Sequence, residues 1–224
     1  MERYSRLLEL SDFSKKDLEV LLCKKVLIIG VGGVGQHVAT YLVTNGVTNL
    51  TIVDFDEVEM SNLNRQILLT EEDVGKKKVE VVKKALNAKN KDALIKAINC
   101  KVDESNVSEL ITCNYDVVID CLDNWKGKLV ISEECSKKHI PFLHIGVDGM
   151  RGQYALFEHC SLQDLVSDEI INAPKDGVMG PMVGAVASLA TVHLIKYLLG
   201  KADPDELHYL DFDSHQFSKI KILR

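Results

Sequence analysis

The chain has 224 residues, of which 46% are hydrophobic and 27% charged, so it can bury a full core and is expected to form a single domain over residues 1–224. Its 27 Lys and Arg against 33 Asp and Glu give a net charge of −6, which disfavours a general affinity for nucleic acid or an anionic membrane. The first ten residues lack the apolar core of a secretory signal, so we expect a cytoplasmic protein.

The N-terminal segment, residues 1–24, is expected to contribute a helix ahead of the main fold. Residues 14–22 have the composition of a short helix. Ser14 can cap its N-terminus, and Asp17 stands where a capping box would place its second partner.

Residues 25–146 alternate between two patterns. Short apolar, β-branched runs predict strands that are buried on both faces, at residues 25–30, 50–54, 94–99, 115–120 and 142–145. Runs with helical spacing lie between several of them, at residues 34–45, 75–87 and 125–139. This alternation predicts an α/β fold with a doubly wound, Rossmann-like and mainly parallel sheet.

The pattern changes after residue 146. Residues 152–158 and 206–211 alternate like antiparallel strands, and a long helix is expected over 183–199. We therefore expect the C-terminal half, 147–224, to extend the sheet with antiparallel strands and to contain a crossover loop at about 158–176. The 183–199 helix carries too many polar residues to span a bilayer, so no membrane segment is expected.

A glycine-rich stretch, GVGGVG, joins the first expected strand to the first expected helix of the sheet. Its glycines, Gly30, Gly32, Gly33 and Gly35, would let backbone N–H groups approach a phosphate at a helix N-terminus. Asp54 ends the next strand, where a carboxylate can accept hydrogen bonds from ribose hydroxyls. Together these features predict a nucleotide or dinucleotide site.

The residues that follow favour a triphosphate over a nicotinamide dinucleotide, although the glycines also satisfy G-x-G-x-x-G. Polar side chains gather after the second strand, namely Asp56, Ser61, Asn62, Arg65, Gln66 and Lys78. Arg65 and Lys78 are interpreted as phosphate ligands, with a surface ion pair as the alternative for Arg65. Lys76 and Lys77 are expected to lie on a solvated helix face.

A second acidic group, DCLDN, follows the 115–120 strand. Its side chains should lie at the carboxyl edge of the sheet, where open α/β sheets bind ligands. We assign Asp123 to Mg²⁺, which takes few protein oxygens and completes its shell with phosphate and water. Asp120 has an alternative role as a turn or helix cap.

Six motifs in order resemble the ThiF/MoeB/HesA family, bacterial relatives of the ubiquitin-activating enzymes: GVGGVG, the strand ending in Asp54, SNLNRQ, VGKKKVE, DCLDN and GVMGPMVGAVASL. The resemblance implies an ATP-dependent adenylyltransferase with ATP and Mg²⁺ as cofactors. In this family the C-terminal Gly-Gly carboxylate of a small ubiquitin-like sulfur carrier of the ThiS/MoaD type becomes an acyl-AMP, with release of pyrophosphate, for thiamine or molybdopterin biosynthesis.

The resemblance also implies residue roles. Gly33 belongs to the phosphate loop, Asp54 binds ribose, and Asp123 with Asn124 forms the magnesium end, while the phosphates are held by Asn62, Arg65 and Lys78. Arg6 matches an arginine that reaches into the partner subunit's ATP site, so a homodimer is expected. The catalytic set is therefore Arg6, Arg65, Lys78 and Asp123.

The sequence departs from the family in its cysteines. Many members bind a structural zinc with two C-x-x-C pairs, but none of the six cysteines here has that spacing, so no zinc site is expected. A reactive cysteine that relatives carry before the GVM motif is replaced within residues 172–176, which puts thioester or persulfide chemistry in doubt. Cys121 and Cys160 could substitute, yet Cys121, like His144 and His193, is interpreted as a packing residue.

Two alternatives stay open. The adenylated group could be a peptide, a free amino acid or a modified tRNA base, the last being disfavoured by the acidic net charge. The chain could also be a non-catalytic nucleotide-binding module that positions a sulfur-carrier partner.

Overall fold

The computed structural model describes residues 2–172 and 176–222. In this part of the chain eight strands form one sheet in the order β3-β2-β1-β4-β5-β6-β7-β8. Pairing is parallel from β3 to β5 and antiparallel from β5 to β8. The predicted fold class is thus confirmed, with strands β1 Lys25–Ile29, β2 Asn49–Asp54, β3 Leu94–Asn99, β4 Val117–Asp120, β5 Phe142–Asp148, β6 Arg151–Phe157, β7 Glu206–Asp211 and β8 Gln216–Lys221.

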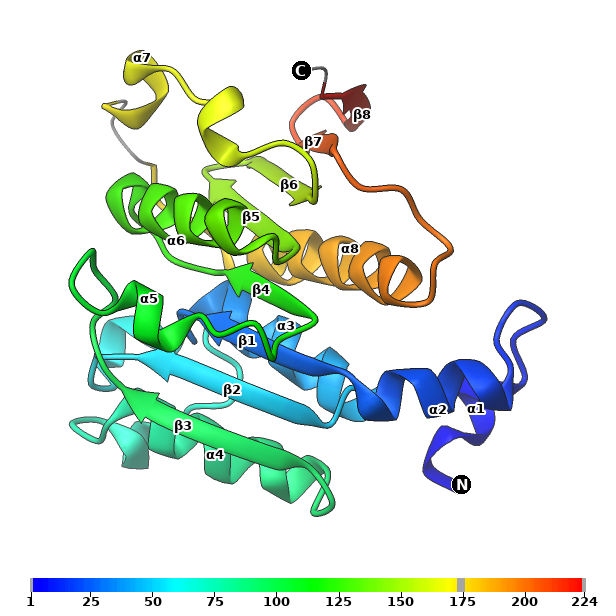
Figure 1. Ribbon diagram of the computed structural model, residues 1–224. Helices are drawn as coiled ribbons and strands as arrows, with labels where there is room; N and C mark the ends of the chain where they lie inside the picture. The colour runs from blue at the N-terminus through cyan, green and yellow to red at the C-terminus, as the bar shows by residue number, and fades with distance from the viewer. Residues whose placement is uncertain (1, 173–175, 223–224) are drawn as a thin grey trace.

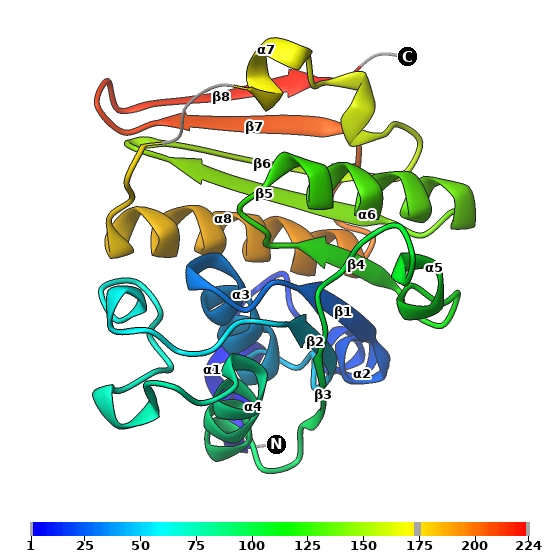
Figure 2. The ribbon, with the colours of Figure 1, turned by 90° about the vertical axis from the view of Figure 1, so that its left-hand side faces the viewer.

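Helices cover both faces of the sheet (Figure 1). One face packs against α3 Gly33–Thr44, α4 Lys78–Lys89 and α8 Gly180–Leu198, and the other packs against α5 Val107–Leu110 and α6 Trp125–Lys138. Two hydrophobic clusters, one on each side, form the core. Figure 2 looks toward the side of the molecule to which the arrows of β1, β2 and β3 point in Figure 1.

The N-terminal segment contains α1 Ser5–Leu8 and α2 Lys15–Cys23. The capping box is confirmed, because the Ser14 hydroxyl accepts the Asp17 N–H at 3.2 Å and the Asp17 carboxylate accepts the Ser14 N–H at 2.8 Å. Leu18 of α2 packs against the turn after α3, where Gly46 has φ +107°. A Cβ on Gly46 would lie 2.9 Å from Leu18 Cδ1, so this glycine lets α2 approach the sheet.

The start of α4 was predicted wrongly: the helix begins at Lys78 and not at residue 75. Gly75 has φ +83°, its N–H bonds to the Val58 carbonyl, and Lys77 forms an antiparallel bridge with Glu57. These contacts hold residues 75–77 in an extended turn. As a result Lys78, the first residue of α4, lies next to the end of β2.

Helix α8 begins earlier than predicted, at Gly180, with Pro181 in its first turn, a favoured place for proline. A Cβ on Gly180 would lie 2.5 Å from the Asn64 carbonyl oxygen, so the helix start packs directly on the loop after β2. By length and composition alone α8 could cross a membrane. It nevertheless packs against the sheet through an apolar stripe, as core helices of globular proteins do, formed by Met182, Val183, Val186, Ala187, Ala190, Leu194 and Leu198.

Candidate functional site

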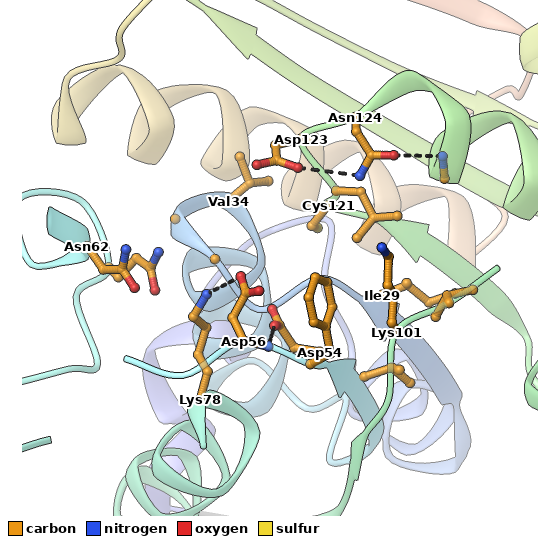
Figure 3. Close-up of a pocket in the computed structure, with 18 of the residues that line it drawn as sticks. Ile29, Val34, Asp54, Asp56, Asn62, Lys78, Lys101, Cys121, Asp123 and Asn124 are labelled. Atoms are coloured by element: carbon orange, nitrogen blue, oxygen red, sulfur yellow. Dashed lines mark hydrogen bonds and ion pairs between the residues drawn. The ribbon is translucent and has the colours of Figure 1, made fainter. Parts of the chain in front are cut away.

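A cleft of about 710 Å³ opens at the carboxyl ends of β1, β2 and β4, the edge at which open α/β sheets bind ligands. Figure 3 shows Asp54, Asp56 and Lys78 on one side of it and Asp123 with Asn124 on the other. Most of the predicted cofactor-binding residues line this cleft: Gly32, Gly33, Asp54, Asp56, Ser61, Asn62, Arg65, Gln66, Lys78, Asp123 and Asn124.

The remaining two glycines of the loop act in packing. Gly30 has φ +91°, and a Cβ there would lie 2.8 Å from the Cys121 carbonyl oxygen. A Cβ on Gly35 would lie 2.0 Å from the Gly30 carbonyl oxygen. These two positions let β1, α3 and the end of β4 meet closely. The N-terminus of α3, capped by Gly32, therefore faces the cleft with its first N–H groups, which suits an anion.

Asp54 is fixed at the end of β2 by the backbone. Its Oδ2 accepts the Val31 N–H at 2.8 Å and its Oδ1 accepts the Asp56 N–H at 2.9 Å. Burial raises the pKa of this carboxyl, and the positive charge of Lys78 opposes the rise. Since each carboxylate oxygen has a second lone pair, a held Asp54 can still accept hydrogen bonds from a diol in the cleft.

Lys78 places a cation in the lining of the cleft. Its side chain is 4% exposed, and its Nζ lies 2.9 Å from Oδ2 of Asp56, which is 48% exposed. A buried ammonium needs a partner of opposite charge. Asp56 supplies one here, and a ligand phosphate at the same place would supply another. In contrast, Lys76 pairs with Asp73 on the surface and Lys77 is exposed. Both lysines are solvated as predicted, but they precede α4 and do not lie on a helix face.

The loop after β2 carries Arg65 over the glycine loop. Its Nη1 donates to the Ser61 carbonyl and to Asn64 Oδ1, each at 2.9 Å. Within residues 2–172 and 176–222, Arg65 forms no ion pair with an acid. The loop is anchored by Gln66, which is 3% exposed and accepts from Gln36 of α3 at 3.2 Å.

Asp123 and Asn124 differ in their roles. Asn124 Oδ1 accepts the Gly127 N–H at 2.9 Å and caps α6, while its Nδ2 lies 3.5 Å from Asp123 Oδ1. Asp123 is exposed to the cleft. The described residues contain no group of three or more His, Cys, Asp or Glu side chains able to hold a metal ion. A metal beside Asp123 would therefore take most of its oxygen ligands from phosphate and water, which fits Mg²⁺.

The family is decided by a match of the ThiF family model to residues 4–224. The chain belongs to the ThiF family. The ThiF-family chain is 34% identical over 233 residues to the molybdopterin-synthase adenylyltransferase of Escherichia coli K12, with 100% of this chain and 93% of that protein covered. It is 33% identical to the E. coli sulfur carrier protein ThiS adenylyltransferase, with 99% and 91% covered.

A third relative, the sulfur carrier protein adenylyltransferase of Thermus thermophilus, is 30% identical, with 100% of this chain and 88% of that protein covered. Among solved structures, E. coli MccB with ATP superimposes with a TM-score of 0.88 at 22% identity, covering 99% of this chain and 72% of that one. The structural likeness shows a shared fold, and the relatives confirm the resemblance predicted from the sequence.

Arg6 of the ThiF-family chain lies outside its own cleft. Figure 1 shows α1 and α2 beyond the amino-terminal ends of β1 and β2, whereas the cleft opens at the carboxyl ends of these strands. The Arg6 side chain is 89% exposed and pairs with Glu9 at 2.7 Å. The structure thus brings together the other predicted catalytic residues, Arg65, Lys78 and Asp123, and leaves Arg6 free to contact another molecule.

The ThiF-family cleft also contains residues that the sequence patterns did not single out. Phe55 is 51% exposed, and Lys101 Nζ lies 5.5 Å from its ring centroid. Both line the cleft, with Cys100 and Val102 beside them. Lys101 follows β3, the parallel neighbour of β2. Its place directly after a strand could therefore have predicted that it lines the cleft. These residues give the cleft an aromatic and apolar end.

The structure shows the surroundings of the two cysteines that could substitute for a reactive one in this ThiF-family chain, Cys121 and Cys160. Burial, together with the charge of Asp120, raises the pKa of the Cys121 thiol, so this side chain stays protonated at neutral pH. The backbone N–H of Cys160 donates to Asp205 Oδ1 at 3.1 Å, which holds the start of the crossover loop. The expected replacement of a reactive cysteine within residues 172–176 was implied by the resemblance alone, and residues 173–175 lie outside the described residues.

Proposed function

We propose that this ThiF-family chain is an ATP-dependent adenylyltransferase that activates the C-terminal Gly-Gly carboxylate of a small ubiquitin-like sulfur carrier of the ThiS/MoaD type. The names of the relatives at 30–34% identity support this substrate class. The observation that carries the proposal is the cleft itself, which joins Asp54 and the glycine loop to Arg65, Lys78 and Asp123 around one volume.

The reaction needs charge neutralisation and alignment, and it needs no protein nucleophile. One oxygen of the carrier carboxylate forms a bond to the α-phosphorus of ATP, and the bond from that phosphorus to the β-phosphate oxygen breaks. Pyrophosphate leaves with the electron pair, so no proton is transferred. Asp54 would hold the ribose, while the N-terminus of α3, Arg65 and Lys78 would bind the phosphates.

Mg²⁺, when bound between Asp123 and the phosphates, would neutralise charge on the leaving pyrophosphate. The exposed Asp123 carboxylate presents the oxygen donors that Mg²⁺ prefers. In this proposal Ser61, Asn62 and Gln66 shape the phosphate side of the cleft, and Asn124 fixes the start of α6 next to Asp123.

The remaining parts of the proposal concern the whole assembly. Residues 1–224 act as one adenylation unit in a cytoplasmic homodimer, to which the 1–24 segment contributes Arg6. The carrier protein is the partner, a sulfur donor acts after adenylation, and the products serve thiamine or molybdopterin biosynthesis. No structural zinc is required.

We expect the purified protein to bind ATP with Mg²⁺ at least about tenfold more tightly than NAD, because Arg65 and Lys78 supply charged partners for a third phosphate. Titration calorimetry with ATP, AMP and NAD measures this directly. Lys78→Met should weaken ATP more than AMP, while Lys84→Met, an exposed lysine of the same helix, should change neither. Binding of NAD as tight as ATP would contradict the proposal.

We also expect acyl-AMP to form without a protein thioester. Cys121→Ala and Cys160→Ala should each retain most of the ATP–pyrophosphate exchange that the carrier supports, since the reaction uses no thiolate. Mass spectrometry of the enzyme quenched during turnover should find no thiol-sensitive adduct. A covalent carrier adduct on Cys160 that turnover requires would show instead that the loop supplies its own nucleophile.

A further inference from the structure

A polar network is buried beneath the loop that carries Asp123. Asp120 ends β4, Lys128 lies in α6 and His144 lies in β5, and their side chains are 0%, 6% and 1% exposed. Asp120 Oδ2 accepts from Lys128 Nζ at 2.8 Å and faces His144 Nδ1 at 3.1 Å. The sequence interpretation of His144 as a packing residue is therefore incomplete, because its ring also hydrogen-bonds.

The chemistry of the partners sets the protonation of this network. An ionised carboxylate only accepts hydrogen bonds, so His144 Nδ1 carries the proton and its Nε2 accepts from the Gln153 amide at 3.3 Å. Burial, with the charge of Lys128, lowers the pKa of His144. Burial opposes ionisation of Asp120, but Lys128 and His144 outweigh it and lower the pKa of that carboxyl. One anion, one cation and one neutral ring therefore share the site.

Each member of the network makes a further contact near the segment between β4 and α6. Asp120 Oδ1 accepts the Leu122 N–H at 3.0 Å and so fixes the turn after β4, which confirms the alternative role of Asp120 as a turn cap. Lys128 Nζ donates a second bond to the Ile145 carbonyl at 3.0 Å, joining α6 to β5. The His144 ring stacks on Trp125, the first residue of α6, with ring centroids 5.7 Å apart.

A contribution to stability does not explain this network well, since a buried ion pair often stabilises a fold no more than well-packed apolar side chains would. The position of the network beneath the loop that carries Asp123 suggests a role in the site. Among residues 2–172 and 176–222, the Asp123 carboxylate has one side-chain hydrogen bond, of 3.5 Å to Asn124, so its position depends on the backbone between β4 and α6. Asp120, Lys128 and His144 fix both ends of that segment.

We propose that Asp120, Lys128 and His144 are positioning residues that hold residues 121–124 so that Asp123 meets the metal–phosphate group at a fixed place. This inference rests on the proposed function for the identity of that ligand. Outer partners that orient metal ligands typically contribute about 10–100-fold to metal affinity. The network should therefore act on the Mg²⁺-linked part of ATP binding and leave the ribose and glycine-loop contacts unchanged.

The test uses a variant that removes both charges together, Asp120→Asn with Lys128→Met, so that no unpaired charge stays buried. A second variant, His144→Phe, keeps a ring on Trp125 but loses the bond to Asp120, and it serves if the first does not fold. The matched control is Glu133→Gln with Lys137→Met, an exposed ion pair of 2.7 Å in the same helix. Calorimetry measures ATP affinity with and without Mg²⁺, and thermal unfolding confirms that each variant is folded.

The positioning variants are expected to bind ATP alone within about twofold of the wild type but to lose at least about tenfold of the gain in affinity that Mg²⁺ gives. The control should keep that gain. If the folded positioning variants keep it too, the network is only structural and this inference is wrong, while the proposed function stands. If the wild-type protein itself shows no Mg²⁺-linked gain, the assignment of Asp123 fails and the inference fails with it.

Discussion

Replacing Asp123 with alanine is expected to lower the rate of ATP–pyrophosphate exchange at least about a hundredfold, the usual scale for removing a charge partner of the transition state. The fold should not change, because Asp123 is exposed and the one side-chain hydrogen bond that it forms within the described part of the chain, to Asn124 at 3.5 Å, is weak. The loss should therefore appear in kcat with an unchanged melting temperature.

The measurement compares exchange rates at saturating ATP and carrier. Arg65→Ala should lose activity on the same scale. Within the described residues the Arg65 guanidinium donates hydrogen bonds through Nη1 alone, so its other N–H groups can bind a phosphate. Glu133→Ala removes an exposed carboxylate from α6 and should keep full activity. An Asp123→Ala enzyme that retained more than about a tenth of the wild-type rate would show that this carboxylate is no charge partner in the transition state.

The parallel half of the fold follows closely from the sequence because its signals are local. Strand β3 has the predicted bounds, and the apolar runs at β1 and β2 are displaced by a residue at most. Strand β5 continues to Asp148, three residues beyond its predicted end at residue 145, because Gly146 pairs with Gln153 of β6. A glycine that marks a strand end in isolation can continue a strand when an antiparallel partner lies beside it.

The parts that were missed depend on backbone pairing that the residue patterns do not show. The start of α4 is fixed by bonds from residues 75–78 to Asp56 and Val58, which the lysine run does not reveal. Strand β8 was not predicted separately, because all of its residues are exposed and such a strand has no buried face to impose an alternating pattern. Its place is set by pairing with β7, whose bounds were predicted.

Part of the candidate site was likewise predicted from local sequence patterns, and part of it was not. Polar residues directly after apolar strands predict a cleft-lining position, as for Asp54, Asp56 and Asp123, because parallel strands bring their carboxyl ends to one edge. The network beneath them could not be read from the sequence, since Asp120 at the end of β4 meets Lys128 of α6 and His144 of β5, residues from three different elements. Which side chains pair in such a network depends on how the elements pack in the fold, and the spacing of residues along the sequence does not show it.

The last prediction concerns Arg6, which the resemblance places in the partner subunit's site. The cleft opens at the carboxyl ends of β1, β2 and β4, whereas α1, which contains Arg6, lies beyond the amino-terminal ends of β1 and β2 (Figure 1). A catalytic Arg6 therefore has to act across a dimer. Arg6→Ala should leave stability nearly unchanged, because an exposed pair such as Arg6–Glu9, with side chains 89% and 61% exposed, contributes little. A large loss of exchange activity would then report on catalysis alone.

Mixing two inactive proteins makes this test decisive. In a heterodimer of Arg6→Ala and Asp123→Ala chains, one site combines an intact Asp123 with the partner's intact Arg6, and the other site lacks both. Random exchange between subunits of a twofold dimer should restore about a quarter of the wild-type activity. Mass spectrometry of intact dimers has to show that subunits exchanged. Exchange without any recovery would mean that each site is built from one chain, and that Arg6 serves a purpose other than completing its partner's cleft.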